Sequence, residues 1–493
     1  MLGTIRRFWR DQRGIALLLV SVMLPAIVGF SLLAIDMSRV NNMHNDLQKA
    51  GDAMALAAAA ELDGRTDSIV RADRALATLV SNKYTFSTAG VPQTLLAAGV
   101  TRTYLRSLPA SDSSLIAAAN IITDEVTDAP NARFIRVTVM PVGFSAIFPA
   151  SFLTGNTASN GFNVGAVSVA GFTSGVCNYT PVFICNPYEM VNGTNSAGGV
   201  TLEQAAADSS IRRRLIELRT VGNNAAYGPG NFGFLAPPDT VGNGAKGLAE
   251  TIATSKPIGC YSSQGVSTKT GQNTGPVQDA FNVRFGIDPS GGGFNSSVYG
   301  PAANVRKGAS ATNANQCPKY NQLTFNAAGD MGLPRDATTP YMGGRMGDGN
   351  WNLSSYWSTN FGGTSYPSSW DTSKPTRYQV YRYEIANNLV GHASTGGEVG
   401  TPPSSCQPPV TSVDRRLLYG AILNCNALEA AGNDLNGNST NLPVEAFASF
   451  FLTEPVPGAN AGGSVFVELV DITGRGGAGT LDSFLRDEAQ LYR

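Results

Sequence analysis

The segment from Ile15 to Ile35 constrains this chain more than any other, because it contains no charged residue and is almost entirely apolar. At 1.5 Å per residue, a helix of this length crosses the ~30 Å hydrocarbon core of a bilayer. A helix also pairs every backbone group within the segment, which lipid requires. Pro25 cannot donate a hydrogen bond, so we expect a bend there. The sequence therefore predicts a transmembrane helix over 15–35.

The flanking charges predict the orientation of this helix. Four basic residues and one acid precede it: Arg6, Arg7, Arg10, Arg13 and Asp11. Because positive charge stays inside, we expect residues 1–14 in the cytoplasm and residues 36–493 on the other side of the membrane. A cleaved signal peptide is the alternative, but its apolar region would be shorter and would end at a small-residue site, which Ile35-Asp36-Met37 does not offer. We expect a retained single-pass anchor.

The composition suits an exported body. Charged residues make up 14% of the chain and the formal net charge is −1, so no overall field favours nucleic acid. All six cysteines lie beyond the apolar segment, and an even number in an oxidising compartment predicts disulfides, with free buried thiols as the alternative. The pairing that we predict joins neighbours along the chain: Cys177–Cys185, Cys260–Cys317 and Cys406–Cys425.

A helical pattern continues beyond Asp36. Apolar residues recur every three or four positions and polar residues fill the other face. This apolar stripe consists of Val40, Met43, Leu47, Ala50, Met54 and Ala57. Gly51 interrupts the pattern at a cost of ~1 kcal/mol, which a strong helix can absorb. We expect one nearly continuous helix over 15–62, half in the membrane and half projecting from it as a stem.

The following residues predict a small domain on this stem. Residues 65–85 continue the helical spacing, and the period then shifts toward two. The expected half-buried strands cover 101–105, 133–139 and 162–169. A long helix followed by antiparallel strands is a pilin-like α+β domain, which with the stem would occupy residues 36–175.

Residues 176–493 differ in composition, with short apolar runs between long stretches rich in Gly, Asn, Ser and Pro. One or two helices are expected over 202–218, with Arg212, Arg213 and Arg214 on the solvated side. The expected buried strands cover 182–185, 416–424 and 465–472, and 444–452 is either strand or helix. Strands interleaved with helices predict a loop-rich α/β domain, whose long loops we interpret as ordered insertions.

The pattern from Arg6 to Leu62 combines RRFWRDQRG, the apolar segment and AIDMSRVNNMHNDLQKAGDAMALAAAAEL. It resembles the N-terminal segment of TadE/TadG-like proteins of the bacterial tight-adherence (Flp) pilus system. The stretches CNYTPVFICNPYE, GPGNFGFL, QDAFNVRFG, DRRLLYGAILNC and FFLTEP resemble the C-terminal part of TadG-related assembly proteins. Related minor pilins are cut after a Gly and carry Glu five residues beyond the cut. Gly14 is in place, but the fifth residue is Leu19, so the resemblance does not support this processing.

The resemblance implies a non-enzymatic structural or assembly component of a Tad pilus, held in the bacterial inner membrane with its bulk in the periplasm. Its partners would be the inner membrane and pilins or minor pilins, and the resemblance is compatible with an oligomer. No cofactor would be needed. The apolar stripe would pack against pilin helices, where small Ala side chains permit close approach. Some relatives carry a von Willebrand A domain whose metal site needs Asp-x-Ser-x-Ser. The motif is absent, so a von Willebrand A-like sheet here would be a degenerate version without metal.

No motif points to catalysis. The two histidines, His44 and His392, stand alone, and the chain contains no G-x-S-x-G, H-E-x-x-H or phosphate-binding loop. We therefore predict no catalytic, cofactor-binding or metal-binding residues.

Aromatic residues concentrate in the stretch 351–383, which holds Trp351, Trp357 and Trp370. Flat aromatic faces beside amides and hydroxyls suit glycan or protein contact. The alternative that we favour is that these side chains fill the core of a loop-rich domain. An envelope adhesin that binds glycan or matrix through this stretch is the second candidate function, and a scaffold unrelated to pili is a third.

Overall fold

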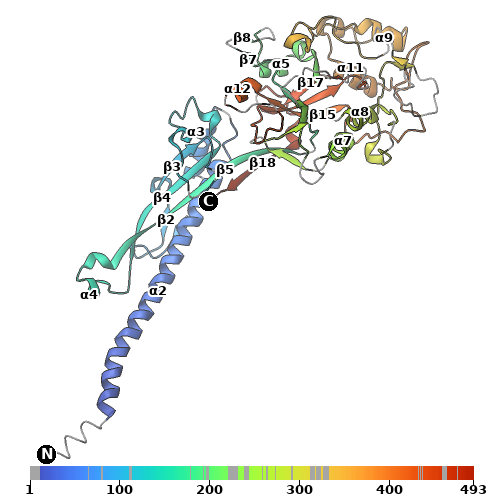
Figure 1. Ribbon diagram of the computed structural model, residues 1–493. Helices are drawn as coiled ribbons and strands as arrows, with labels where there is room; N and C mark the ends of the chain where they lie inside the picture. Colours follow the sequence, from blue (N-terminus) through green and yellow to red (C-terminus); the bar gives the residue numbers. More distant parts are fainter. Residues whose placement is uncertain are drawn as a thin grey trace, which may run out of the picture. The chain divides into compact units, whose positions relative to one another are not determined.

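The chain divides into two compact units, described separately below (Figure 1). Unit 1 comprises Met1–Thr173 and Asp487–Arg493, and unit 2 comprises Ser174–Arg486. The computed structural model describes residues 12–64, 66–78, 82–109, 111, 114–177, 179–191, 194–195, 199–219, 231–237, 244–257, 259–262, 265–271, 274–289, 293–310, 317, 324–325, 332–430, 432, 435, 437–457, 464–474 and 476–492.

Unit 1 is built on one long helix, α2 (Gln12–Ala59), which runs through Pro25 without ending. The expected continuous helix from the apolar segment into the stem is confirmed. Its second half is rich in alanine, the best helix former, and an apolar side chain recurs at each turn. The chain reverses after Ala59, where Gly64 adopts a positive φ of 83°, a conformation that costs glycine little.

The second half of α2 packs against a β-sheet and a second helix, α3 (Ser68–Thr78). The sheet has the strand order β5-β4-β3, all antiparallel, and β18 pairs with β5. The strands and short helices of unit 1 are β1 (Asn82–Tyr84), β2 (Gln93–Leu95), β3 (Val100–Leu105), β4 (Phe134–Ser145), α4 (Ser151–Thr154), η4 (Thr157–Asn160), β5 (Gly161–Cys177) and β18 (Leu485–Leu491). The three expected strands are therefore confirmed.

Burial alternates along β4, as a sheet with one covered face requires. Ile135, Val137 and Val139 are buried under α2, whereas Arg136 and Met140 between and beyond them are exposed. The part of 65–85 beyond α3 differs from the prediction, because residues 82–84 form β1, which pairs with β2 in a two-stranded ladder.

Unit 2 is organised around a five-stranded sheet with the order β6-β15-β16-β17-β9. Its strands are β6 (Phe183–Cys185), β9 (Leu215–Arg219), β15 (Leu417–Leu423), β16 (Ala446–Leu452) and β17 (Val465–Ile472). Only β6 and β15 run parallel, and the other three pairs are antiparallel. The sheet thus differs from the parallel sheet that interleaved strands and helices predict, so the fold as a whole is a mixed α+β one.

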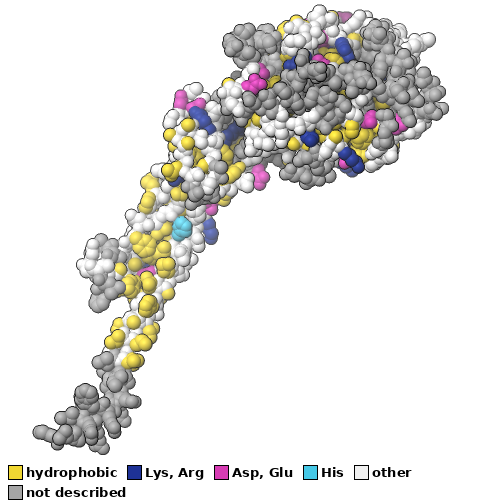
Figure 2. All heavy atoms as spheres, in the orientation of Figure 1, with side chains coloured by type: hydrophobic (Ala, Val, Ile, Leu, Met, Phe, Trp, Pro, Cys, Tyr) yellow, Lys and Arg dark blue, Asp and Glu magenta, His cyan; other side chains and the backbone are white. Residues whose placement is uncertain are grey.

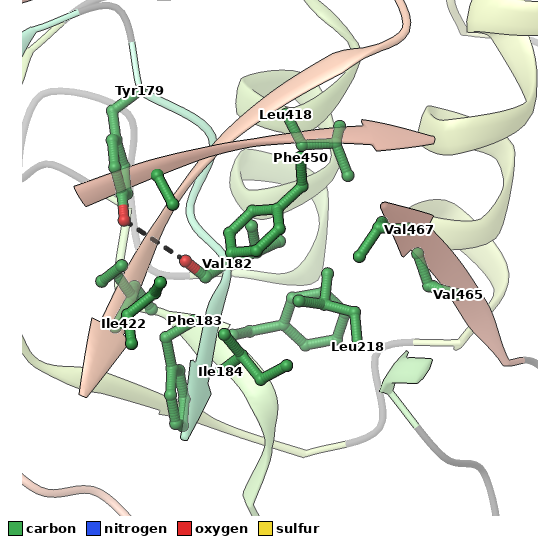
Figure 3. Packing of buried hydrophobic residues seen from close by; sticks show 14 of the residues in the cluster. Tyr179, Val182, Phe183, Ile184, Leu218, Leu418, Ile422, Phe450, Val465 and Val467 are labelled. Atoms are coloured by element: carbon green, nitrogen blue, oxygen red, sulfur yellow. Dashed lines mark hydrogen bonds between the residues drawn. The ribbon is translucent and has the colours of Figure 1, made fainter. Parts of the chain in front are cut away.

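Both faces of this sheet are covered, which explains why every residue of β16 is buried. Leu418 pairs with Phe450, and both lie in the larger core, which Figure 3 shows around Val182, Phe183, Ile184 and Val467. The neighbouring pair, Leu417 and Phe451, lies in a smaller aromatic core on the other face. Successive strand residues face opposite ways, so one sheet serves two cores.

Helices and short strands complete unit 2. The helices are α5 (Leu202–Ala207), α6 (Ser209–Arg212), α7 (Ala245–Ala253), α8 (Thr274–Asn282), α9 (Leu353–Phe361), α10 (Ser369–Ser373), α11 (Arg377–Ala386) and α12 (Cys425–Ala430). The short strands are β7 (Met190–Val191), β8 (Thr194–Asn195), β10 (Asn231–Leu235), β11 (Cys260–Ser262), β12 (Thr268–Thr270), β13 (Ala309–Ser310) and β14 (Thr324–Phe325).

The helical prediction for 202–218 is wrong beyond Arg212. The last residues of that range form β9, which pairs with β17 and buries Leu215, Ile216 and Leu218. Arg213 is also not on a solvated side. It is 5% exposed, and its guanidinium donates to the Lys374 carbonyl. Pairing with β17 at the edge of the sheet determines the structure of residues 215–219, although their local sequence pattern is helical.

Candidate functional site

Between Leu19 and Ile35, most apolar side chains of α2 are exposed. Val22, Ile27 and Phe30 are 67%, 59% and 74% exposed, and Figure 2 shows hydrophobic side chains along this part of the helix. Among the described residues, α2 is the one helix that is long and apolar enough to cross a membrane. The arginines on which the predicted orientation depends, Arg6, Arg7 and Arg10, lie outside the described residues.

The predicted helix-packing stripe does not lie on a free surface. Met43, Leu47, Ala50 and Met54 are at most 1% exposed, because they form the core of unit 1 with the sheet and α3. Val40 packs partly buried at the edge of that core, and Ala57 is half-buried. The prediction that this stripe packs against a pilin helix is therefore wrong for its four central residues, since this chain's own sheet already covers them.

Asp36 connects the end of the apolar segment to the loop between β4 and β5. It is 4% exposed, and its carboxylate accepts backbone hydrogen bonds from Ile147 at 3.0 Å and Phe148 at 2.6 Å. Arg39 donates to the same carboxylate at 3.0 Å and lies 5.1 Å from the centre of the Phe144 ring. Hydrogen bonds to a carboxylate are about twice as strong as neutral ones, so Asp36 holds this loop against α2.

A polar cluster joins α2 to the middle of β5. Ser168 is fully buried and donates to the Asp52 carboxylate at 2.6 Å. Gln48 donates to Asp52 at 2.8 Å, to Ser168 at 3.0 Å and to the Val167 carbonyl at 3.1 Å. These bonds determine the register of the helix on the strand, which apolar contacts alone specify less precisely.

The aromatic stretch of unit 2 is helical rather than a loop, because α9, α10 and α11 carry it. Trp351 and Trp357 are 9% and 2% exposed, so neither offers a face to a ligand, and Trp370 is half-buried. Trp357 contacts the rings of Phe361 and Trp370 at centroid distances of 4.5 and 6.0 Å. The ligand-contact prediction is thus wrong for Trp351 and Trp357, which fill the aromatic core.

Buried ion pairs connect these helices to the sheet. Arg377, at the start of α11, is fully buried and pairs with Glu468 of β17 at 3.1 Å and with Asp336. The Glu468 carboxylate also accepts the backbone N–H groups of Arg377 and Tyr378 at the helix N-terminus. Burial raises the pKa of Glu468, an effect that these donors oppose. A buried ion-pair network of this kind can fix the orientation of a helix, here α11, against the sheet that it covers.

A second buried pair lies in the same helical layer. Arg306 and Glu384 are 3.4 Å apart, and Glu384 also accepts hydrogen bonds from Asn304 and the Tyr356 hydroxyl. All four side chains are buried and have partners, so they can specify one packing arrangement but have no access to a substrate. Among the described residues, no group of three His, Cys, Asp or Glu could hold a metal ion.

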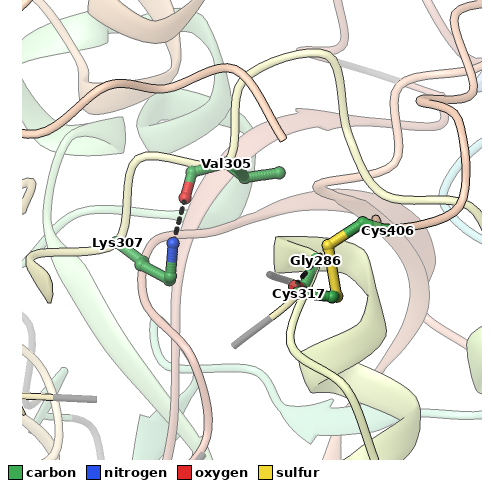
Figure 4. The surroundings of a disulfide bond; sticks show 5 residues. All are labelled: Gly286, Val305, Lys307, Cys317 and Cys406. Carbon is green, nitrogen blue, oxygen red and sulfur yellow. Dashed lines mark hydrogen bonds between the residues drawn. A yellow bond between two sulfur atoms is a disulfide. The ribbon is translucent and has the colours of Figure 1, made fainter. Parts of the chain in front are cut away.

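All six cysteines form disulfides, but the predicted pairing is wrong. The bonds join Cys177 to Cys260, Cys185 to Cys425 and Cys317 to Cys406, each across more than 80 residues of sequence. The first links β5 to β11 at a position where the two strands pair, and the second links β6 to the start of α12. Figure 4 shows the third, beside the carbonyl of Gly286. The pairing follows the sheet rather than sequence distance.

The residues that sequence reasoning missed are Asp36 as a loop anchor, the cluster around Ser168, and the loop that Asp36 binds. Asp36 carried one signal, since a buried acid at the end of an apolar helix needs donors. Its partners are more than 100 positions away in the chain, where no local pattern can reveal them. No family model, curated protein or solved structure matches this chain.

Proposed function

We propose that this protein is a single-pass structural component for assembly of a bacterial tight-adherence (Flp) pilus. Residues 15–35 of α2 would span the inner membrane, with residues 1–14 in the cytoplasm and residues 36–493 in the periplasm. In this proposal unit 1 is a pilin-like domain, and unit 2 is a mainly antiparallel α+β domain that acts without catalysis, cofactor or metal.

One observation carries the proposal: α2 has two halves with different environments. Most apolar side chains from Leu19 to Ile35 are exposed, whereas the residues from Val40 onward form the core helix of an antiparallel sheet domain. An apolar helix that continues without a break into a small α+β head is the architecture expected of a pilin-like subunit. The sequence resemblance of residues 6–62 to TadE/TadG-like proteins supports the same assignment.

The burial pattern changes how such a protein would contact pilins. Because Met43, Leu47 and Met54 are already buried, lateral helix packing would use the membrane half of α2. That half contains small residues, including Ala26 and Gly29, which permit close helix approach in lipid. Unit 2 would then reach other envelope components.

The test is to delete the gene in its host and count surface pili by electron microscopy. Three complementing genes are compared: the full chain, residues 176–493 alone, and a full chain whose residues 15–35 are replaced by an unrelated Leu/Ala segment of equal length. We expect only the natural full chain to restore pili. The replacement keeps an anchor but removes the specific helix surface, so it separates anchoring from lateral packing.

Two results would contradict the proposal in different ways. Normal pilus numbers in the deletion strain would rule out an assembly role, and weakened surface attachment in that strain would support the adhesin instead. Full rescue by the Leu/Ala replacement would retain the assembly role but reject packing through the membrane half of α2.

A further inference from the structure

The loop between β4 and β5 lies beside the apolar half of α2. The backbone amides of Ile147 and Phe148 bind Asp36, and a Cβ added at Gly29 would lie 3.5 Å from the Phe148 ring. Gly29 is seven residues before Asp36, about 10 Å along the helix at 1.5 Å per residue. Phe148 lies beside both positions, through its ring and its amide, so the loop reaches the level of the apolar segment. Leu32, between these two positions, is half-covered on the same face.

From Val137 onward, β4, the loop and β5 contain no charged residue, and Arg136 of β4 lies just before this stretch. No Asp, Glu, Lys, Arg or His occurs from Val137 to Tyr188, although 14% of the whole chain is charged. Ile147 in the loop and Phe162 at the start of β5 are 50% and 48% exposed. An uncharged loop with exposed apolar side chains beside a membrane-length helix is typical of a surface that contacts a membrane.

The backbone of this loop is also internally paired. Ala146 donates to the Asn160 carbonyl, and Ser151 donates to the Asn160 side chain. At the end of α4, the N–H groups of Thr154 and Gly155 donate to the carbonyls of Ala150 and Ser151. Together with the two amides that Asp36 accepts, these bonds reduce the dependence of the loop on water, and lipid tolerates non-helical backbone only when it is satisfied in this way.

We propose that the loop of residues 146–160, here called the β4–β5 tip, inserts into the outer interface of the bilayer that α2 spans. The tip contacts lipid at the headgroup–acyl boundary, where the apolar side chains of interfacial segments are buried about 5–10 Å deep. The tip and α2 then form a two-point anchor, which restricts the tilt and rotation of unit 1 on the membrane. Asp36 acts as a positioning residue, because it holds the tip at this depth. The proposal rests on the proposed membrane anchoring of α2.

The test measures the depth of a nitroxide label on the full chain in vesicles of phosphatidylethanolamine and phosphatidylglycerol. All native cysteines are paired, so Ile147→Cys provides a single reactive thiol under non-reducing conditions. Two controls are labelled in the same way: Ile27→Cys in the apolar segment and Leu115→Cys, a 95% exposed apolar position in unit 1. Accessibility to oxygen reports lipid, and accessibility to a nickel chelate reports water.

We expect the labels at positions 27 and 147 to favour oxygen and the label at position 115 to favour nickel. A lipid signal at 27 with a water signal at 147 would overturn the proposal while leaving the anchor intact. Low accessibility of position 147 to both reagents would also overturn it, because the tip would then contact protein. A water signal at 27 would reject the anchor and, with it, the proposal.

Discussion

At the scale of single residues, Gly51 shows how closely α2 approaches β5. A Cβ at this position would lie 2.8 Å from the Ser168 hydroxyl and 3.4 Å from a methyl of Val139. Ser168 cannot move easily, since it is hydrogen-bonded to Asp52 and Gln48. The glycine that looks like a tolerated defect in the helix is therefore a contact point between helix and sheet.

Gly51→Ala is expected to lower the stability of unit 1 by up to about 2 kcal/mol, because an overpacking cost of about 1–3 kcal/mol outweighs the ~1 kcal/mol gain in helix propensity. Hydrogen exchange of α2 amides in the full chain measures this change. In a Ser168→Ala background the same substitution should cost less, because the nearest atom is gone. Equal costs in the two backgrounds would argue against a contact between these residues.

Asp36 provides the second prediction at this scale. Asp36→Asn replaces one of the two accepting oxygens with an NH₂ group that faces a backbone N–H. The free energy of local opening at the Ile147 and Phe148 amides should fall by about 1–3 kcal/mol, so hydrogen exchange of these amides should become faster. Asp46→Asn is a matched control on the same helix, since Asp46 accepts a hydrogen bond from the side-chain hydroxyl of Thr85 rather than from the loop amides. Unchanged protection of the two amides in Asp36→Asn would contradict the role of this residue.

Glu189 predicts a pH dependence. Burial raises its pKa to about 7 from 4.5, with help from Glu445 and Glu429 and against a hydrogen bond from the Asn426 amide. A raised pKa means that the folded protein binds the proton on Glu189 more tightly than the unfolded chain does. Proton binding at Glu189 therefore contributes fully to the folding stability below pH 4.5, and this contribution is lost as the pH rises through 7. The melting temperature should therefore fall between pH 5 and pH 8 by more in the natural protein than in Glu189→Gln. Parallel curves for the two proteins would disprove the prediction.

At the scale of elements, strand pairing determines which cysteines meet. Cys177 and Cys260 lie opposite each other in the β5–β11 ladder, and Cys185 is in β6, which pairs with β15 just before α12 begins at Cys425. The sheet order brings these segments together across 83 and 240 residues of chain. Closing loops of this length constrains the unfolded chain strongly.

Non-reducing peptide mapping should recover the pairs Cys177–Cys260, Cys185–Cys425 and Cys317–Cys406. Replacing Cys185 and Cys425 by Ser should lower the stability of unit 2 by about 2–5 kcal/mol, measured by chemical unfolding under non-reducing conditions. Peptides that contain Cys177 linked to Cys185 would show that the order of strands in the sheet is different.

At the scale of the whole molecule, α2 is the described helix that is long and apolar enough to cross a membrane, and most of its apolar half is exposed. Leu24→Lys combined with Ile27→Lys should release much of the protein from carbonate-washed membranes, since each central lysine costs about 2.5–3.5 kcal/mol in a transmembrane helix. Val70→Lys with Leu96→Lys is the matched control, because these unit 1 side chains are equally exposed. Equal membrane retention of both variants would exclude α2 as the anchor.

Much of the fold could be predicted from residue order alone, because the signals are local. A charge-free run predicts a membrane-length helix, a period of 3.6 extends that helix to Ala59, and a period of two predicts β3, β4 and β5. Local periodicity shows which face of an element is apolar but not what covers it. The stripe on α2 was therefore correctly identified as apolar and wrongly assigned to another protein's helix.

Tertiary structure decided the features that depend on distant partners. Asp36 meets Ile147, Gly51 meets Ser168, and Cys185 meets Cys425 only because the chain reverses direction and the strands pair in one order. No pattern within a few residues carries that order. The sequence by itself determined the membrane-length helix and the alternation of the strands, since these follow from side-chain chemistry repeated along the backbone. The contacts that position the β4–β5 tip beside that helix came from the fold alone.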